Sequence, residues 1–282
     1  YVRTWQYRLC DSTTACFKRQ CEIREQQVIN IGKTLSLTCA SLIKRFVPRA
    51  FGRGDWLAIG VLFPVAFLFA WMKPGRTAWH VAGKCSRLFF RICGIPLAAR
   101  GLENLPASGA FVIASNHTSY LDGAALLAVL DWRSYAFVAK GELQSNPFTR
   151  IFVGGLGALF VERFDVQKSA EHADELVEAV RRGVSLIVFP EGTLLRHTGL
   201  MPFRAGAFQA AAQAGVPVVP VALRGVRSVL RDGTWYPRRA PISVTFGAPV
   251  TVEGGDWNAT LKLRDQVRAE ILRHCGEPDL EK

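Results

Sequence analysis

The sequence predicts an α/β fold in which helices cover a mixed, mostly parallel β-sheet. Two observations predict it. The chain has 282 residues, which is enough to bury a large core. From residue 101 onward, short runs rich in Val, Ile and Phe alternate with longer amphipathic stretches, a pattern typical of strands joined by crossover helices. The alternation continues almost to the end of the chain, so we expect one sheet.

The expected strands are short apolar runs bounded by turn residues. They cover residues 111–115, 134–139, 158–161, 185–189, 216–223 and 242–246. The expected helices carry apolar residues at helical spacing, and they cover residues 123–130, 148–156, 167–181, 204–214 and 258–274. Parallel strands place their carboxyl ends at one edge of the sheet, and ligands bind at that edge in open α/β folds.

The positive charge of the chain lies in its first third. Residues 1–100 contain 16 Lys and Arg against four acidic residues, whereas residues 101–282 contain 19 of each sign, so the first third accounts for the whole formal charge of +12. Such a segment attracts nucleic acid or an anionic membrane surface. The sequence has no zinc spacing, recognition-helix signature or aromatic-basic repeat, so we expect no nucleic-acid partner.

The apolar run of residues 56–72 favours a membrane. It holds 17 residues without a charge, at the short limit of a membrane span, and Trp56 and Trp71 lie near its ends as interfacial anchors. Pro64 would bend it. Basic residues flank both sides, so the positive-inside rule gives no direction. A bent or in-plane anchor with both ends on the cytoplasmic face is at least as good an interpretation as a simple span, and in a bacterium the membrane would be the inner one.

Residues 79–95 extend this interpretation. Lys84, Arg87 and Arg91 share one helical face and apolar residues form the other, which favours a helix lying in the lipid headgroup layer. The alternative is a core helix packed on the following domain. We therefore expect three parts, with a seam near residues 96–106: a basic segment of unknown role at 1–55, membrane-anchoring or interfacial helices at 56–100, and a catalytic domain at 101–282.

The cysteines and histidines indicate no metal site. Six of the seven cysteines lie in the first hundred residues, no CxxC pair occurs, and their number is odd. Neither a disulfide framework nor a zinc site is suggested, so reduced thiols are expected. The histidines outside the motif described next lack ligand spacing: His80, His172, His197 and His274.

The segment from Asn116 to Asp122 carries the clearest chemistry. It directly follows an expected buried strand and places His117 five positions before Asp122. A carboxylate can fix the tautomer of an imidazole and support its positive charge while the ring takes a proton. The pair suits the activation of a hydroxyl that does not belong to the protein.

Three further clusters fall at expected strands or their ends. Gly157–Arg163 ends one strand with an arginine, whose planar fork suits phosphate. Phe189–Thr193 runs from a strand into a Gly-Thr turn that offers N–H groups and a hydroxyl. Val216–Ala222 is an apolar strand containing Pro217 and Pro220. Each cluster alone has an ordinary structural explanation, as a solvated strand end, a turn or an edge strand. Four such clusters in this order are hard to assign to chance.

Together these motifs resemble the glycerolipid acyltransferase family over roughly residues 80–275. The family carries NHxxxxD, GxxFxxR, FPEGT followed by a basic residue, and a proline-containing apolar strand. Here the FPEGT block is followed by Leu194, with Arg196 two positions later, and Arg204 stands where members often carry Lys. Either arginine could approach a phosphate.

The resemblance implies an O-acyltransferase that acylates 1-acylglycerol 3-phosphate at its sn-2 hydroxyl, with acyl-CoA or acyl carrier protein as co-substrate and no other cofactor or metal. His117 would be the general base and Asp122 its orienting partner. No GxSxG elbow appears, which argues against an acyl-enzyme and against a hydrolase. The residues expected to hold the acceptor are Asn116, Lys140, Arg163, Glu191, Gly192, Thr193, Arg196 and Arg204.

Two alternatives stay open. The acceptor could be another lysolipid, such as a lyso-ornithine lipid or lysophosphatidylethanolamine, or glycerol 3-phosphate. The chain could instead be a non-catalytic lipid-binding or scaffolding relative, although nothing structural demands the His117–Asp122 pair. Membrane phospholipid and lysophospholipid are the expected partners, beside the acyl donor.

Overall fold

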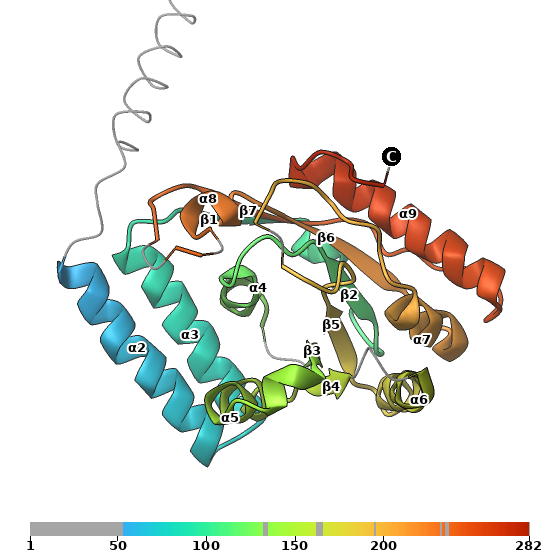
Figure 1. Ribbon diagram of the computed structural model, residues 1–282, viewed down its shortest axis with the longest axis horizontal. Helices are drawn as coiled ribbons and strands as arrows, with labels where there is room; N and C mark the ends of the chain where they lie inside the picture. The colour runs from blue at the N-terminus through green and yellow to red at the C-terminus, as the bar shows by residue number, and fades with distance from the viewer. Residues whose placement is uncertain are drawn as a thin grey trace, which may run out of the picture. The chain divides into compact units, whose positions relative to one another are not determined.

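A computed structural model describes residues 53–131, 135–161, 166–194, 196–231, 233–234 and 237–281. Their contacts place them in one compact unit, Arg49–Lys282. Figure 1 shows helices on both sides of a central sheet, so the expected α/β fold is confirmed. The helices are α2 (Arg53–Met72), α3 (Arg76–Ile92), α4 (Asp122–Val129), α5 (Pro147–Gly155), α6 (Val166–Arg181), α7 (Gly206–Ala214), α8 (Val226–Val229) and α9 (Trp257–Cys275).

The sheet has seven strands in the order β1-β7-β6-β2-β5-β3-β4. Five of them, from β6 to β4, run parallel, while β7 is antiparallel to β6 and β1 is parallel to β7. The expectation of a mixed, mostly parallel sheet is therefore confirmed. The strands are β1 (Leu97–Arg100), β2 (Val112–Ser115), β3 (Tyr135–Lys140), β4 (Leu159–Val161), β5 (Ser185–Val188), β6 (Val218–Arg224) and β7 (Ile242–Phe246).

Alternation along the strands divides the core into two layers. In β2, Ile113 faces the layer formed with α3 and α4, whereas Val112 and Ala114 face the layer formed with α6, α7 and α9. Both sets are fully buried, because a strand in the middle of a parallel sheet is covered on each face. This explains why the strand reads as a continuous apolar run.

The segment expected to be a seam instead contributes a strand. Leu97–Arg100 forms β1 and pairs with β7 at the edge of the sheet. Four residues with alternating exposure and an arginine at the end give too weak a periodic signal to be found in the sequence. The helix before it, α3, buries Trp79 and Phe90 in the core while Lys84, Arg87 and Arg91 are exposed.

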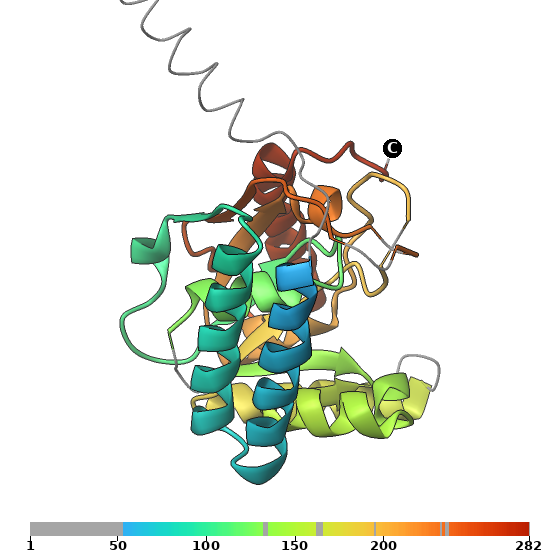
Figure 2. The same cartoon turned by 90° about the vertical axis from the view of Figure 1, so that its left-hand side faces the viewer.

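The apolar run lies in α2, which packs beside α3 and against α5, as Figure 2 shows. Ala66 and Ala70 are buried, and Phe63 and Phe67 contact aromatic rings of α5. Among the described helices, none combines the length and the apolarity that crossing a membrane requires. The other side of α2 exposes large apolar side chains at Leu57, Val61, Val65, Leu68, Trp71 and Met72.

Candidate active site

The motif residues gather at the carboxyl edge of the parallel strands. The chain leaves β2 after Ser115, passes through residues 116–121 and enters α4 at Asp122. The strand β5 ends at Val188, directly before the Phe189–Thr193 turn. Because β2 and β5 are parallel neighbours, His117 and the turn meet at this edge.

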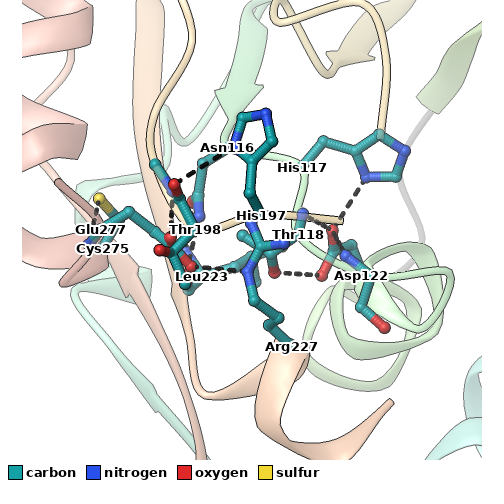
Figure 3. A network of polar contacts seen from close by, with 12 residues as sticks. Asn116, His117, Thr118, Asp122, His197, Thr198, Leu223, Arg227, Cys275 and Glu277 are labelled. Atoms are coloured by element: carbon teal, nitrogen blue, oxygen red, sulfur yellow. Dashed lines mark hydrogen bonds and ion pairs between the residues drawn. The ribbon is translucent and has the colours of Figure 1, made fainter. Parts of the chain in front are cut away.

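His117 and Asp122 form a hydrogen-bonded pair. The Nδ1 atom of His117 lies 2.9 Å from Oδ2 of Asp122, whose side chain is fully buried while the imidazole is 25% exposed. The same Oδ2 accepts the N–H groups of Thr118 at 2.5 Å and Ser119 at 2.8 Å, and Oδ1 accepts the Thr118 hydroxyl at 3.2 Å. Asp122 therefore organises the whole turn before α4, as Figure 3 shows.

The pairing selects the chemistry of the imidazole. A carboxylate that receives a hydrogen bond from Nδ1–H leaves Nε2 with a lone pair, and Figure 3 shows that nitrogen pointing away from Asp122. The ring also stacks on Phe189, with centroids 4.4 Å apart and planes at 24°. Stacking and hydrogen bonding together fix the ring, so Nε2 is presented as a general base.

Asn116 has a structural partner. Its amide donates to the carbonyl of Leu223 at 2.9 Å and accepts the N–H of Leu223 at 2.7 Å. The side chain thus pairs with β6 as a backbone group would, and it is fully buried. The expected contact of Asn116 with substrate stays a prediction.

Glu191 connects the turn to the backbone of His117. Its Oε1 accepts the N–H of His117 at 2.7 Å, and its Oε2 accepts the N–H of Met201 at 3.0 Å. The side chain is buried, and burial raises the pKa of its carboxyl, while the two N–H groups act in the opposite direction. Both oxygens have protein partners, so the geometry gives Glu191 a holding role. Binding of substrate by Glu191 stays a prediction.

The turn after β5 requires a glycine. Gly192 has a φ of 77°, in the left-handed region that a Cβ disfavours, and its N–H donates to the carbonyl of Phe189 at 3.0 Å. Thr193 follows, half-buried.

Of the two cations expected to bind phosphate after neighbouring strands, the structure describes Lys140. Lys140 ends β3, is half-buried, and has its Nζ 3.9 Å from Oε2 of Glu142. Backbone pairing sets Lys140 opposite Val161, the last residue of β4. Arg163 comes two positions later and lies outside the described residues. Its role stays a prediction.

Arg196 and Arg204 both follow the Glu-Gly-Thr turn and both are exposed. The Arg196 guanidinium lies beside Gly233, where an added Cβ would be 3.3 Å from Nη2. The N–H of Arg204 donates to the carbonyl of Pro190 at 2.9 Å. Arg196 therefore lies against the β6–β7 connection, and Arg204 is fixed through its backbone.

Three contacts of the site involve residues to which the sequence motifs assign no role. Phe189 stacks on His117, although the sequence showed it only as a motif letter. Met201 contributes a backbone N–H, for which no side-chain signal exists. Ser119 donates its hydroxyl to the carbonyl of Leu230 at 2.8 Å and so ties the catalytic loop to the β6–β7 connection.

Comparison with known proteins assigns the chain to a family. A family model described as Acyltransferase matches residues 97–224. A 1-acyl-sn-glycerol-3-phosphate acyltransferase of Limnanthes douglasii is 31% identical over 205 residues, which cover 70% of this chain and 67% of that protein. The chain belongs to the glycerolipid acyltransferase family. All four motif blocks lie within or at the end of the matched region.

Other members of the glycerolipid acyltransferase family are similar over different lengths. The chloroplast 1-acyl-sn-glycerol-3-phosphate acyltransferase BAT2 of Brassica napus is 37% identical over 48% of this chain, and the match spans 39% of that relative. The crystal structure of the 1-acyl-sn-glycerophosphate (LPA) acyltransferase PlsC from Thermotoga maritima is 21% identical, covers 78% of this chain and 92% of its own, and has a TM-score of 0.61. It supports the fold.

Proposed function

We propose that the chain is a membrane-bound O-acyltransferase. It moves a fatty acyl group from an acyl thioester, acyl-CoA or acyl carrier protein, to the sn-2 hydroxyl of 1-acylglycerol 3-phosphate and produces phosphatidate. The single observation that carries the proposal is the His117–Asp122 pair, with Nδ1 bound at 2.9 Å to a buried carboxylate. The names of the relatives support the acceptor.

The reaction needs one proton transfer in each direction. Nε2 of His117 takes the proton of the acceptor hydroxyl while the hydroxyl oxygen attacks the thioester carbonyl carbon. The carbon–sulfur bond then breaks, and the imidazolium returns the proton to the leaving thiolate. Asp122 stabilises the imidazolium between these steps through the Nδ1 hydrogen bond. No bond to the protein forms.

The acceptor phosphate needs cationic partners at the same edge of the sheet. Lys140 ends β3 there, and Arg163 follows β4, which is parallel to β3. We assign both to the phosphate, with the N–H and hydroxyl of Thr193 and the guanidinium groups of Arg196 and Arg204 nearby in the chain. The pattern of cations after strand ends supports this assignment.

The test is an acyl-transfer assay of the purified chain in mixed micelles. The acceptor panel contains 1-acylglycerol 3-phosphate, lysophosphatidylethanolamine, a lyso-ornithine lipid and glycerol 3-phosphate, each with both donor types. We expect transfer to the first acceptor, and a loss of ~10²–10⁴ in turnover for His117→Ala, the usual range for a positioned acid–base group. His274→Ala is the control, because that ring is exposed and pairs with Glu270 on α9.

Two outcomes would contradict the proposal. If the turnover of His117→Ala is close to that of the unmodified chain, His117 is not the general base. If acyl transfer to an uncharged analogue is as efficient as transfer to 1-acylglycerol 3-phosphate, the assignment of a phosphate-binding site is wrong. In the same assay Arg163→Ala should raise KM for the phosphate-bearing acceptor and leave KM for the uncharged analogue unchanged.

A further inference from the structure

The C-terminal tail, residues 276–281, returns from α9 to the active-site side of the sheet. It pairs with the loop of residues 199–204, which follows the Glu-Gly-Thr turn. Leu200 donates its N–H to the carbonyl of Pro278 at 2.8 Å and accepts the N–H of Leu280 at 3.1 Å. Leu200 and Asp279 thus form a short parallel bridge. The tail acts as an extra strand for this loop.

Arg268 of α9 joins the loop to the tail. It is only 6% exposed, and its Nη2 donates to the carbonyl of Leu200 at 3.0 Å and to Oδ1 of Asp279 at 2.6 Å. Its Nε donates to the carbonyl of Met201 at 3.1 Å, and its Nη1 lies 2.9 Å from Glu281. A planar guanidinium can make these contacts at the same time, and an ammonium group cannot.

A third ion pair ties the tail to α8. Oε2 of Glu277 accepts the N–H of Gly199 at 2.6 Å, and Oε1 accepts Nε of Arg227, on α8, at 3.0 Å. Figure 3 shows Arg227 and Glu277 paired in the same polar network view as His117 and Asp122. The helix α8 leads to Leu230, whose carbonyl holds Ser119. The tail therefore contacts both segments that support the catalytic loop.

These contacts lead to the general base by one continuous route. Arg268 holds the carbonyl of Met201, the N–H of Met201 donates to Glu191, and the other oxygen of Glu191 holds the N–H of His117. Each link is a hydrogen bond to a buried or half-buried group. A shift of the loop would leave one oxygen of a buried carboxylate without a donor, which is costly in a low-dielectric interior.

We propose that Arg268 is a positioning residue for His117, and that it acts with the tail by fixing Met201 and Glu191. The proposal rests on the proposed acyl transfer, because it assigns Arg268 to the arrangement of that general base. Arg268 does not touch the imidazole. Its loss should therefore lower turnover and leave acceptor binding largely intact.

The experiment compares Arg268→Gln and Arg268→Lys with Arg273→Gln, a control on the same helix whose side chain is 69% exposed and pairs with Glu270. We expect kcat of Arg268→Gln to fall by about 10- to 100-fold, the effect of a small misplacement of a reacting group, with KM for the acceptor within about twofold. Arg268→Lys should recover part of the loss, because it keeps the charge but not the fork. Arg273→Gln should be unchanged.

Amide hydrogen exchange gives a readout independent of activity. Glu191 protects the N–H groups of His117 and Met201, so Arg268→Gln should speed exchange in peptides that cover residues 116–122 and 199–204, while peptides covering β2 and β6 stay protected. If the unmodified chain transfers no acyl group, the proposed function fails and this exchange pattern still decides the positioning role.

Three results would overturn the inference: a folded Arg268→Gln with kcat near that of the unmodified chain, a loss confined to KM, or unchanged exchange in both peptides. If Arg268→Gln does not fold by circular dichroism, the Asp279→Asn, Glu281→Gln double variant replaces it. That variant leaves Arg268 bonded to the loop and removes the two tail charges that face Arg268, so a smaller loss of kcat with the same exchange pattern is expected. An unchanged double variant would equally overturn the inference.

Discussion

At the scale of single residues, the site depends on two buried carboxylates with different partners. Asp122 receives hydrogen bonds from three successive residues, one of them the imidazole of His117. Glu191 receives only backbone N–H groups, from His117 and Met201. One carboxylate therefore orients the ring, and the other orients the main chain that carries the ring.

Burial of Glu191 has a measurable effect on stability. Its carboxyl has a pKa raised by burial, so the folded chain binds more protons than the unfolded chain between the ordinary and the raised pKa. The stability of the fold therefore decreases as pH rises through that window and levels off above it. Glu191→Gln removes this dependence and adds a constant cost, because an amide nitrogen cannot accept a hydrogen bond.

The measurement is urea unfolding of both proteins at a series of pH values from the ordinary carboxyl range to neutrality. We expect the unfolding free energy of the unmodified chain, minus that of Glu191→Gln, to decline with rising pH and then stay constant. A difference that does not change with pH, or that increases, would contradict the assignment.

At the scale of elements, close helix packing brings α2 against α5. Gly155, the last residue of α5, lies against the backbone of Ala70 in α2, and its carbonyl accepts the N–H of Gly75 at 2.8 Å. A Cβ at Gly155 would lie 2.2 Å from the carbonyl oxygen of Ala70. No side chain fits there unless the helices separate.

Gly155→Ala should therefore destabilise the fold by about 1–3 kcal/mol, the usual cost of forcing a group into a packed interface. Gly154→Ala is the matched control, because its nearest neighbour would be a ring carbon of Phe160 at 3.8 Å. The control should be neutral, or more stable by up to ~1 kcal/mol through helix propensity. The midpoints of urea unfolding compare the two variants. Equal midpoints would show that α2 moves away from α5 without a loss of stability.

Comparison of the elements with the sequence shows where pattern reasoning works. The expected strand at 242–246 coincides with β7, and the other strands and helices expected after residue 101 match within two residues at each end, whereas the helix expected at 79–95 is α3, three residues earlier. The strand β1 and the four-residue α8 were not found, because such short elements have no period. Pro220 suggested an edge strand, yet β6 is interior. The pairing of β6 with β7 begins only at Val221. Pro220 precedes the first pair, so its missing N–H costs no hydrogen bond to β7.

The site was predictable only where side chains form a motif. His117 and Asp122 meet as the spacing predicts, because the turn into α4 reverses the chain between them. Met201 takes part through its backbone, and Arg268 lies in a helix that also carries the partly exposed Arg264 and the exposed Arg273. Neither residue stands in a sequence pattern that marks it as part of the site. Their roles arise only because the tertiary fold brings α9 to this loop.

At the scale of the whole molecule, α2 exposes large apolar side chains on the side turned away from its buried Ala66 and Ala70, and the neighbouring helices α3 and α5 carry exposed apolar residues too. The exposed apolar residues on α2 recur at three- and four-residue intervals, as one face of a helix does. On α3, exposed cations lie beside Leu88 and Ile92, which are about half exposed. We propose this surface as the membrane contact, because acceptor and product are both lipids in the proposed reaction.

Binding to vesicles tests this surface. The triple variant Leu57→Ser, Val61→Ser, Leu68→Ser should lower binding to phosphatidylglycerol vesicles by about tenfold or more, since each exposed side chain loses the apolar area it would bury. Trp257→Ser is the control, because Trp257 is 56% exposed at the start of α9. Flotation through a density gradient measures the bound fraction. Equal flotation of the triple variant and the unmodified chain would place the contact elsewhere.

The carboxylate of Asp122 belongs both to the first turn of α4 and to the loop that carries the imidazole. The two cannot come apart separately, since fraying of that helix end withdraws the acceptor from Nδ1 and from two amides at once. Brief local opening of one helical turn, far less costly than global unfolding, would thus set the lifetime of the reactive arrangement. The working enzyme would pass between competent and idle periods while the rest of its sheet stays intact.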